Sequence, residues 1–397
     1  MTMPEIKTGD PLRLLLADLR CETPRQTIER TNGLYDRLSS PFGHRLVIFG
    51  AGQLGQSVLP AIREAGLEAL AFCDNNARRW GATVDGVPLM SPAEAVQKHG
   101  QEACFLVAVY HSSAPRRQLR ELGCPRIVPY PVFFWKHWRH LPAEERLELP
   151  HRILEQADAI PAGYALLSDD TSRHEFVTQL RWRCLMDYDC LPTPHPAEDM
   201  YFPGELFRLS PEEVVVDCGA FDGDSMQMFL NRSGGRFRHM YLFEPDPSNL
   251  SALAARLAAY PPETAARVST HAYAVGSENG TVRFTADGSA GSRVATGGAI
   301  EIECRTLDRA LAGGPAPTLI KMDIEGAEVQ AIPGAAEIIR RHRPILAVCA
   351  YHRCEHLWII PQLLKQADPG YEIFLRRYAE ECWETVYYAV PAERLVR

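Results

Sequence analysis

Residues 214–225 read VVVDCGAFDGDS, and this stretch decides how the carboxyl-terminal half of the chain is expected to fold. Three valines form an apolar run that ends at Asp217, and Gly219 and Gly223 follow before a helix begins near Asp224. A strand, a glycine turn and a helix in this order open a βαβ unit of a parallel sheet. Ligands of such open sheets bind at the carboxyl ends of the strands. The turn therefore predicts a ligand site.

The charge of this turn indicates which kind of ligand it binds. A dinucleotide favours bare backbone amides that face its pyrophosphate at the helix start, whereas this loop carries Asp217, Asp222 and Asp224. Carboxylates suit a cationic ligand, and S-adenosylmethionine carries both an ammonium and a sulfonium. The predicted cofactor contacts in and around the turn are Asp217, Gly219, Ala220, Phe221, Asp222 and Gly223.

Two later strand ends extend the predicted cofactor site. The sequence YLFEPDP at 241–247 places Glu244, with Pro245 beside it, where an acid accepts hydrogen bonds from ribose hydroxyls. The sequence AYAVG at 272–276 ends a third strand, and Ala274 and Val275 are expected to line an adenine pocket. A loop acid, a ribose acid and an adenine strand in this order are more specific than one glycine motif.

A second acidic stretch, LIKMDIEGAE, occupies 319–328. Asp323 and Glu325 follow an apolar strand at a turn made by Gly326. Glu328 begins the next helix, where a carboxylate interacts favourably with the helix dipole. If this strand lies beside the first one, Asp323 faces the crevice and counts among the cofactor contacts.

A reaction in this crevice that removes a proton from an aligned acceptor needs a base close by. The sequence AYHRCEHLW at 350–358 places His352 at the end of the next predicted strand. Histidine, with a reference pKa near ~6.5, suits a base at neutral pH. The predicted catalytic residues are Asp323, His352 and Glu325. Either His352 or Asp323 is the base and the other orients the acceptor; the sequence does not choose.

Several of these stretches occur together in a known family. Residues from about 213 to 390 resemble the FkbM family of class I, S-adenosylmethionine-dependent methyltransferases. The resemblance rests on VVVDCGAFDGDS, FEPDP, AVGSENGTVRF, CRTLDRAL, LIKMDIEGAEVQAIPGA and AVCAYHRCEHLWIIP, in this order. The family is associated with O-methylation of sugars and natural-product hydroxyls. The resemblance therefore implies a hydroxyl acceptor on a saccharide, a glycosylated metabolite or another natural product.

No metal site is predicted. Cys349, His352, Cys354 and His356 cluster in the sequence, but their spacing matches no common Cys/His zinc site. Cys349 also lies within a strand, where it is expected to face the core. A divalent ion held by carboxylates near Asp323, where it would help to bind a sugar diol, is the alternative.

The amino-terminal part contains a second glycine motif, FGAGQLG at 49–55. Gly50, Gly52 and Gly55 lie between a predicted strand and helix, and Asp74 follows the next strand, which is the pattern of a dinucleotide fingerprint. The stretch DNNARRWGATVDGVPLMSP resembles small Rossmann-like domains attached to bacterial sugar-modifying enzymes. NAD binding, nucleotide-sugar binding, and a structural or oligomerising role stay open for this domain.

The chain is predicted to be an α/β protein with two doubly wound Rossmann-like domains joined by a helical connector. The segments are a helical lead-in at 1–40, a small Rossmann-like domain at 41–139, the connector at 140–210 and the methyltransferase domain at 211–397. The last two predicted strands, at 371–376 and 385–390, have no helical pattern between them. They are expected to form an antiparallel hairpin at the edge of a class I methyltransferase sheet.

Composition limits the partners. The chain has 397 residues, 46% of them hydrophobic and 23% charged, as in a globular protein of two domains. A net charge of −8 without a basic tract speaks against nucleic acid. No apolar run approaches the ~20 residues that span a bilayer, and the start MTMPEIKTGD lacks a leader pattern. The eleven cysteines lie mostly in apolar runs, so we expect a cytoplasmic protein with reduced thiols and no membrane partner.

Two other functions compete with methyl transfer. One is a non-catalytic nucleotide-sugar-binding protein, in which both Rossmann units sense ligands. The other is an NAD-dependent oxidoreductase that works through residues 45–135. A homo-oligomer is compatible with the sequence, and the identity of the acceptor is not readable from it because acceptor pockets are built from variable loops.

Overall fold

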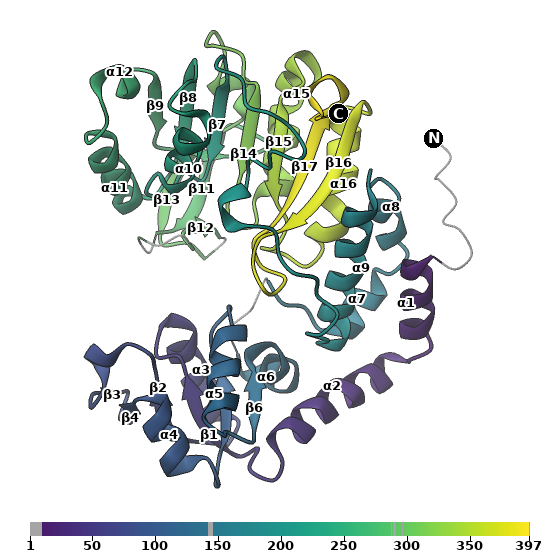
Figure 1. The fold of residues 1–397 in the computed structure, drawn as a ribbon, viewed down its shortest axis with the longest axis vertical. Helices are drawn as coiled ribbons and strands as arrows, with labels where there is room; N and C mark the ends of the chain where they lie inside the picture. Colours follow the sequence, from purple (N-terminus) through teal and green to yellow (C-terminus); the bar gives the residue numbers. More distant parts are fainter. Residues whose placement is uncertain (1–9, 142–145, 287, 289–290, 296, 397) are drawn as a thin grey trace.

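The computed structural model describes residues 10–141, 146–286, 288, 291–295 and 297–396. These residues form two α/β lobes, with the smaller sheet drawn below the larger one in Figure 1. Residues 1–9 of the predicted lead-in and 142–145 of the predicted connector lie outside the described residues. None of the described helices has the length and apolar character needed to cross a lipid bilayer.

The small lobe is built on a six-stranded sheet in the order β3-β4-β2-β1-β5-β6. Its neighbouring strands pair in parallel, except β3 with β4. The strands are β1 (Arg45–Phe49), β2 (Glu68–Cys73), β3 (Thr83–Val84), β4 (Val87–Met90), β5 (Cys104–Val107) and β6 (Ile127–Pro129). The helices are α3 (Gln53–Glu64), α4 (Pro92–His99), α5 (Ser113–Glu121) and α6 (Tyr130–His137).

The hairpin of β3 and β4 was not predicted. Its two-residue turn consists of Asp85 and Gly86, whose φ angles are +47° and +80°. Positive φ at both central residues is the type I′ turn that Asp-Gly favours in hairpins. Val84 pairs with Val87 across the turn. Strands of two and four residues are too short to show an alternating pattern, so the Asp-Gly pair was the only local signal.

Two helices lead into the small lobe, α1 (Pro11–Arg20) and α2 (Pro24–Ser39). α1 buries four leucines in an apolar cluster shared with the larger lobe. α2 begins with a capping box formed by Thr23 and Gln26, and near its end Tyr35 contacts Phe133 of α6 edge to face. The lead-in therefore bridges the lobes, and in Figure 1 α2 runs from the small lobe to α1 at the side of the larger one.

The larger lobe is built on a seven-stranded sheet in the order β16-β17-β15-β14-β7-β8-β9. Its strands are β7 (Val214–Cys218), β8 (His239–Phe243), β9 (Val268–His271), β14 (Leu319–Met322), β15 (Ile345–Cys349), β16 (Tyr371–Arg377) and β17 (Thr385–Pro391). β17 pairs antiparallel with β15 and β16, and the other pairs are parallel. β14 lies between β7 and β15, so the strand that ends in the acidic stretch is next to the strand that ends in the glycine turn.

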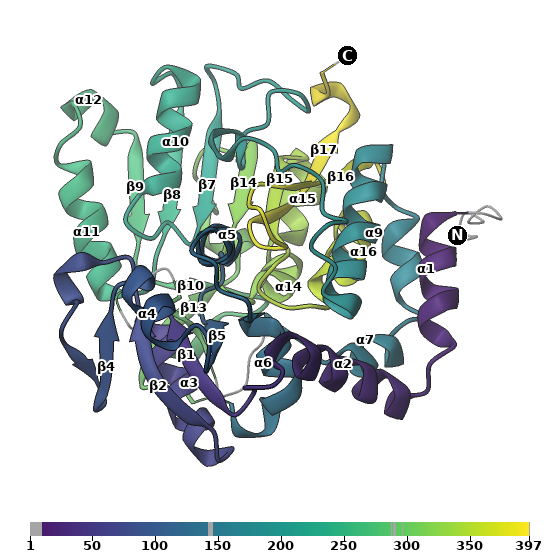
Figure 2. The ribbon, with the colours of Figure 1, turned by 60° about the horizontal axis from the view of Figure 1, so that its bottom comes forward.

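Short helices connect these strands and cover the sheet. They are α10 (Asp224–Ser233), α11 (Pro247–Leu257), α12 (Pro262–Ala265), α13 (Leu307–Ala310), α14 (Glu328–Ala331), α15 (Ala336–His342) and α16 (His356–Ala367). In Figure 2 the arrowheads of β7, β8 and β9 point toward the small lobe. The carboxyl ends of the parallel strands, where ligands of such sheets bind, thus face the small lobe.

A second, four-stranded sheet in the order β10-β13-β11-β12 follows β9 and was not predicted. Its strands are β10 (Ala274–Val275), β11 (Gly280–Thr285), β12 (Arg293–Val294) and β13 (Ile300–Arg305). The third predicted strand, which AYAVG at 272–276 was expected to end, is in fact divided between β9 and β10. β11 and β13 pair antiparallel, with Val282 opposite Ile302. Both strands alternate polar and apolar residues, which is the half-buried pattern that a search for continuous apolar runs overlooks.

The connector is part of the larger lobe. Its helices are α7 (Pro150–Glu155), α8 (Ile160–Tyr164) and α9 (Asp170–Leu185). Asp169 caps α9 and pairs with Arg376 of β16 at 2.7 Å. Leu167 forms a parallel bridge with Ile373, which extends the sheet edge by one residue pair. This packing fixes the start of the last part of the connector. In that part, Tyr201 reaches the end of β14 and donates a hydrogen bond to Asp323.

Candidate active site

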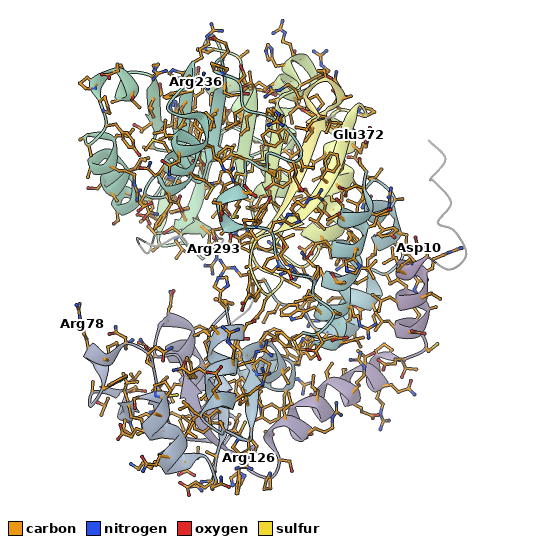
Figure 3. The ribbon with its side chains drawn as sticks, in the orientation of Figure 1. Asp10, Arg78, Arg126, Arg236, Arg293 and Glu372 are labelled. Atoms are coloured by element: carbon orange, nitrogen blue, oxygen red, sulfur yellow. The ribbon has the colours of Figure 1, made fainter. Side chains whose placement is uncertain are left out.

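A cavity of about 400 Å³ lies at the carboxyl ends of β7, β8 and β14. Arg293 lines it and lies on the side of the larger lobe that faces the small lobe, whereas Arg236 lies at the far end (Figure 3). Seven of the predicted cofactor contacts line this cavity: Gly219, Phe221, Glu244, Pro245, Ala274, Val275 and Asp323. The strand ends that the sequence pointed to therefore meet around one space.

Asp217 does not line the cavity, which corrects its predicted role. It belongs to β7, its side chain is almost fully buried, and Lys321 of β14 lies directly opposite it. The Lys321 Nζ is 2.9 Å from one carboxylate oxygen of Asp217, and the hydroxyl of Ser225 donates to the other at 2.5 Å. Because its charge is already neutralised, Asp217 is not available to a cationic ligand.

Lys321 also shapes the glycine turn. Its ammonium donates to the carbonyl oxygen of Gly219 at 2.7 Å. Burial alone would lower the pKa of Lys321, but the carboxylates of Asp217 and Asp323 outweigh burial and raise it, so the ammonium stays charged. The lysine thus fastens the loop to the strand that carries Asp323.

The other predicted loop contacts that do not line the cavity are Ala220, Asp222 and Gly223. Asp222 forms an ion pair with Arg256 of α11 at a distance of 2.5 Å. Gly223 has a φ of +91° and precedes the first residue of α10. Asp224, which was named for its charge but not as a contact, does line the cavity.

Gly219 is required by the close approach of two strand ends. Its φ is +84°, a conformation that strains other residues, and a Cβ on it would lie 1.8 Å from the carbonyl oxygen of Asp323. The next loop residue but one, Phe221, has a φ of +47°. Its backbone N–H donates to Glu244 at 2.9 Å. The turn is therefore held both by β14 and by the predicted ribose acid.

Glu244 lies at the end of β8 with its side chain directed into the loop and the cavity. Besides the N–H of Phe221, it accepts the backbone N–H of Asp246 at 2.8 Å. Burial raises the pKa of Glu244, against the effect of these hydrogen bonds. Each carboxylate oxygen keeps a further lone pair, so the group can also accept from a ligand hydroxyl.

Asp323 lies where the sequence placed it, at the end of β14 and on the cavity wall. It accepts hydrogen bonds from the hydroxyl of Tyr201 at 2.7 Å and from the hydroxyl of Tyr351 at 3.3 Å. Burial by itself would raise the pKa of Asp323, but Lys321, His352 and the Tyr201 hydroxyl together lower it. Asp323 is thus an ionised, oriented carboxylate and a weak base.

His352 is buried behind the cavity and does not line it. Its Nδ1 is 2.8 Å from a carboxylate oxygen of Glu328. Its Nε2 points between the carboxylates of Asp323 and Glu325, at 3.3 and 3.2 Å. Burial alone would lower the pKa of His352, but the carboxylates of Glu328 and Glu325 outweigh it and raise the pKa well above its usual range. This direction favours the protonated imidazole and speaks against the predicted role of His352 as a base, which stays a prediction.

The two glutamates of the acidic stretch have roles that the sequence did not separate. Glu328 is fully buried and accepts both His352 and the backbone N–H of Ile324, at 2.9 Å for the latter, so it does more than stabilise a helix start. Glu325 lines the cavity and pairs with Arg146 of the connector at 2.5 Å. Its φ is +54°, so the backbone is strained where it turns this side chain inward.

Glu384 is a cavity residue that sequence reasoning missed. It lies in the turn between β16 and β17 with a φ of +50°. Burial, followed by the negative charge of Asp323, raises the pKa of Glu384 to about 7. No motif surrounds this residue, and only the hairpin geometry brings it to the strand ends.

Backbone strain is concentrated at the cavity. Among the described residues, seven other than glycine have a positive φ, and four of these line the cavity: Tyr201, Phe221, Glu325 and Glu384. Such conformations cost about 1–3 kcal/mol each and persist where the surroundings hold them in place. The clustering marks this cavity, independently of any motif, as a functional site.

The glycine motif of the small lobe is used internally. Asp74 accepts the backbone N–H groups of Ala51 and Asn76, both at 2.8 Å, so its two oxygens are engaged by the loop itself. A Cβ on Gly55 would lie 1.8 Å from the carbonyl oxygen of Gly50, which has a φ of +102°. Gly52 has open space around it. Packing thus accounts for Gly50 and Gly55, and the NAD and nucleotide-sugar hypotheses stay untested predictions.

The small lobe contacts the hairpin that carries Glu384. Ser112 donates to Glu381 through its backbone N–H at 2.8 Å and its hydroxyl at 2.6 Å. The indole N–H of Trp383 donates to the carbonyl oxygen of Tyr110 at 2.6 Å. The two lobes therefore meet beside the cavity.

Comparison with known proteins assigns the domain around this cavity. Residues 217–370 match the model of the methyltransferase FkbM domain. The crystal structure of a methyltransferase FkbM from Methylobacillus flagellatus KT aligns with 96% of this chain and 100% of its own, at 25% identity and a TM-score of 0.75. A precorrin-6y C5,15-methyltransferase from Geobacter metallireducens GS-15 aligns with 47% of this chain and 84% of its own, at 14% identity. The TM-score of this second alignment is 0.30. A comparison with curated proteins gives no match.

The match over residues 217–370 agrees with the resemblance to FkbM methyltransferases noted from the sequence. The match to the Methylobacillus flagellatus structure extends over nearly the whole chain. The protein is a methyltransferase, and the cavity at the carboxyl ends of β7, β8 and β14 is its candidate active site.

Proposed function

We propose that the protein transfers a methyl group from S-adenosylmethionine to a hydroxyl group of a saccharide or glycosylated metabolite. The observation that carries this proposal is the order of the lining residues along the sheet, which places those after β8 at one end of the cavity and those next to β14 and β17 at the other. One end has Glu244 and the apolar strand β10. The other end has Asp323, Glu384 and tyrosine hydroxyls. A nucleoside and a polyol would each find a matching environment.

The first end fits the donor. Glu244 can accept hydrogen bonds from ribose hydroxyls, as acids at this strand end do in nucleotide-binding sheets. Tyr273, Ala274 and Val275 offer apolar surface for a purine ring. When bound, S-adenosylmethionine supplies an electrophilic methyl group. The main tasks of the protein are then to align the acceptor oxygen and to take its proton.

The second end fits an alcohol that loses a proton. Glu384 has a pKa near the pH of a neutral solution, which is the tuning expected of a general base. Asp323 is already ionised and fixed by two tyrosine hydroxyls, so it is better suited to orient a hydroxyl than to accept its proton. We therefore infer that Glu384 is the base and that Asp323 positions the acceptor.

Methyl transfer to saccharides can be tested directly. The purified protein is incubated with S-adenosylmethionine carrying a deuterated methyl group and with cell extracts or a saccharide panel, and products are searched by mass spectrometry. We expect a product with one added CD₃ group that survives mild alkaline hydrolysis, as a methyl ether does and a methyl ester does not. Calorimetry that detects no binding of S-adenosylmethionine or of its demethylated product to folded protein would contradict the proposal.

A further inference from the structure

Three side chains at the edge of the cavity are arranged as ligands of a metal ion. Asp323, Glu325 and His352, called here the metal triad, each present one donor atom, and these atoms all lie within 4.8 Å of one another. Asp323 and Glu325 line the cavity, while His352 approaches from behind it. Acidic clusters are common on protein surfaces, so the triad needs independent support.

The support comes from the ring nitrogen of His352. Its side chain is only 2% exposed. Nε2 lies within 3.3 Å of oxygens of Asp323 and Glu325, but it meets neither oxygen, nor any other described acceptor, with the geometry of a hydrogen bond. It points between Asp323 and Glu325 rather than at either one. Buried polar atoms without a partner are rare and require an explanation. A group bound between the three side chains would satisfy this nitrogen.

The distances within the triad suit metal coordination. Nε2 lies 3.3 Å from the nearest oxygen of Asp323 and 3.2 Å from that of Glu325. Metal bonds to nitrogen and oxygen of roughly 2.0–2.2 Å place two ligands at right angles about 3 Å apart. The spacing of the triad is therefore that of adjacent positions around one ion, with little movement required.

Glu328 supplies the outer contact that metal-binding histidines usually have. It is fully buried, and its carboxylate lies 2.8 Å from Nδ1 of His352. Without an ion the protonated imidazole is favoured, so a bound cation would displace the proton of Nε2. The carboxylate on the second ring nitrogen then fixes the tautomer whose Nε2 binds the metal. Two backbone N–H groups of the acidic loop, those of Ile324 and Gly326, lie at 2.9 and 3.5 Å from the same Glu328 oxygen and hold it in place.

The charges around the triad favour a cation. Asp323, Glu325 and Glu328 surround His352 on three sides. Arg146 pairs with Glu325 at its outer side, and Lys321 pairs with Asp217. A divalent ion would offset the remaining negative charge. The strained φ of +54° at Glu325 also finds a reason, because it turns this carboxylate toward the other two ligands.

We propose that the metal triad binds one divalent cation whose open positions face the cavity and take hydroxyl oxygens of the acceptor. The part of this proposal that concerns the acceptor rests on the proposed function. Two carboxylates and one imidazole suit Mn²⁺ or Mg²⁺, which prefer oxygen ligands and keep several waters. A vicinal diol of a saccharide can replace two such waters.

Binding of Mn²⁺ to the full-length, chelator-treated protein tests the site without any methyl donor or acceptor. Electron paramagnetic resonance of free Mn²⁺ measures the titration, and we expect one ion per chain. Pulsed resonance of the bound ion should show nitrogen modulation from His352. His352→Gln should abolish the modulation, and Asp323→Asn should weaken binding at least tenfold. Glu328→Gln should weaken binding by about 10- to 100-fold, the usual effect of removing an outer contact.

Glu303→Gln serves as the matched control, because Glu303 is an exposed acid of β13 that pairs with Arg305. It should bind Mn²⁺ as the wild type does. The site is refuted if wild-type protein binds less than one ion per chain, if its bound Mn²⁺ shows no nitrogen modulation, or if Glu303→Gln weakens binding as much as Asp323→Asn. The modulation is measured on wild-type protein, so the test holds even where a variant fails to fold.

The role of the ion toward the acceptor is tested separately. The number of exchangeable waters on bound Mn²⁺, measured in D₂O, should fall when a methyl-accepting saccharide is added, and an unchanged number would overturn this part. If Mn²⁺ binds at the triad but no saccharide is methylated, the site stands and the proposed function falls. If methylation proceeds while no ion binds, the site falls and the proposed function stands.

Discussion

The buried ion pair of Asp217 and Lys321 allows a quantitative prediction. The Lys321 side chain is 4% exposed, and its Nζ lies 2.9 Å from Asp217 and 2.7 Å from the carbonyl oxygen of Gly219. Lys321→Met keeps an unbranched side chain of similar length but removes the charge. Asp217 would then be a buried carboxylate whose remaining hydrogen-bond partner in the described structure is Ser225.

The expected loss is large because a charge would stay buried without its counterion. Removing one partner of a buried ion pair costs about 3–5 kcal/mol, whereas replacing both partners by uncharged groups is often nearly neutral. Lys321→Met should therefore lower the free energy of unfolding by about 3–5 kcal/mol. Asp217→Asn in the same chain, which keeps an acceptor for Ser225, should recover at least about 2 kcal/mol, within the range of coupled neighbours.

Hydrogen–deuterium exchange of the peptides that cover β7 and β14 measures the loss of stability at these two strands. Separate unfolding of the two lobes therefore does not affect the result. A loss of about 3–5 kcal/mol corresponds to exchange that is roughly 100- to 4,000-fold faster. Exchange less than about fivefold faster in Lys321→Met, a loss of about 1 kcal/mol, would refute the reasoning. So would a double variant that exchanges as fast as the single one, since the loss would then not arise from the unpaired Asp217.

Three further predictions concern the cavity. Glu244→Ala should weaken the binding of S-adenosylmethionine, which calorimetry measures. Asp323→Ala should lower kcat but keep this affinity, because only Asp323 faces the acceptor. Equal effects of both variants on affinity would contradict the division of the cavity. In protein without a bound cation the pKa of Glu384 is raised to about 7, so its carboxylate form increases as pH rises through about 7, and kcat/KM should rise with it to a plateau. A cation at the metal triad would move this rise to lower pH. Glu384→Gln should remove this dependence and lower kcat by about 10²- to 10⁴-fold, and a wild-type pH profile in this variant would exclude Glu384 as the base. Gly219→Ala should reduce the free energy of unfolding by at least about 1–3 kcal/mol. In the control Gly204→Ala the new Cβ would meet no heavy atom within 4 Å, so the free energy of unfolding should change by less than about 0.5 kcal/mol. Similar urea midpoints for the two variants would contradict the close contact at Gly219.

The sequence could place residues that follow parallel strands, because such strands bring their carboxyl ends to one edge. Glu244 and Asp323 were located in this way, and both line the cavity. The reasoning needs only strand ends and their order, which long apolar runs show well. For Asp217 the predicted place at the end of the strand is right, but the expected direction of its side chain is not. Asp217 is one residue before the end of β7 and faces β14.

The partner of Asp217 nevertheless left a signal in the sequence. Lys321 interrupts the apolar run LIKM, and a lysine in a buried strand is rare unless it is paired. A parallel neighbour with an aspartate at the equivalent level is the obvious partner once the strand order is known. The sequence alone did not fix the register that sets Lys321 opposite Asp217. It therefore could not show that Asp217 faces a buried lysine, whereas Asp323 faces the cavity.

The state of His352 was not predictable because it depends on three carboxylates whose directions are set by one tight loop. Glu325 and Glu328 are three residues apart, yet one faces the cavity and the other is fully buried. The positive φ of Glu325 separates them. The sequence predicted only that Glu328 begins a helix, and it gave no reason to expect that this carboxylate contacts His352.

Elements distant in the sequence complete the site and decide its chemistry. Tyr201 lies near the end of the connector and orients Asp323, and Arg146 lies near its start and pairs with Glu325. Glu384 comes from the edge hairpin. The strand ends alone would give an acidic edge open to any cation. With the small lobe fixed to the hairpin through Ser112 and Glu381, a shift of either lobe would move Glu384 relative to Asp323. The acceptor end of the cavity is therefore coupled to the position of the small lobe.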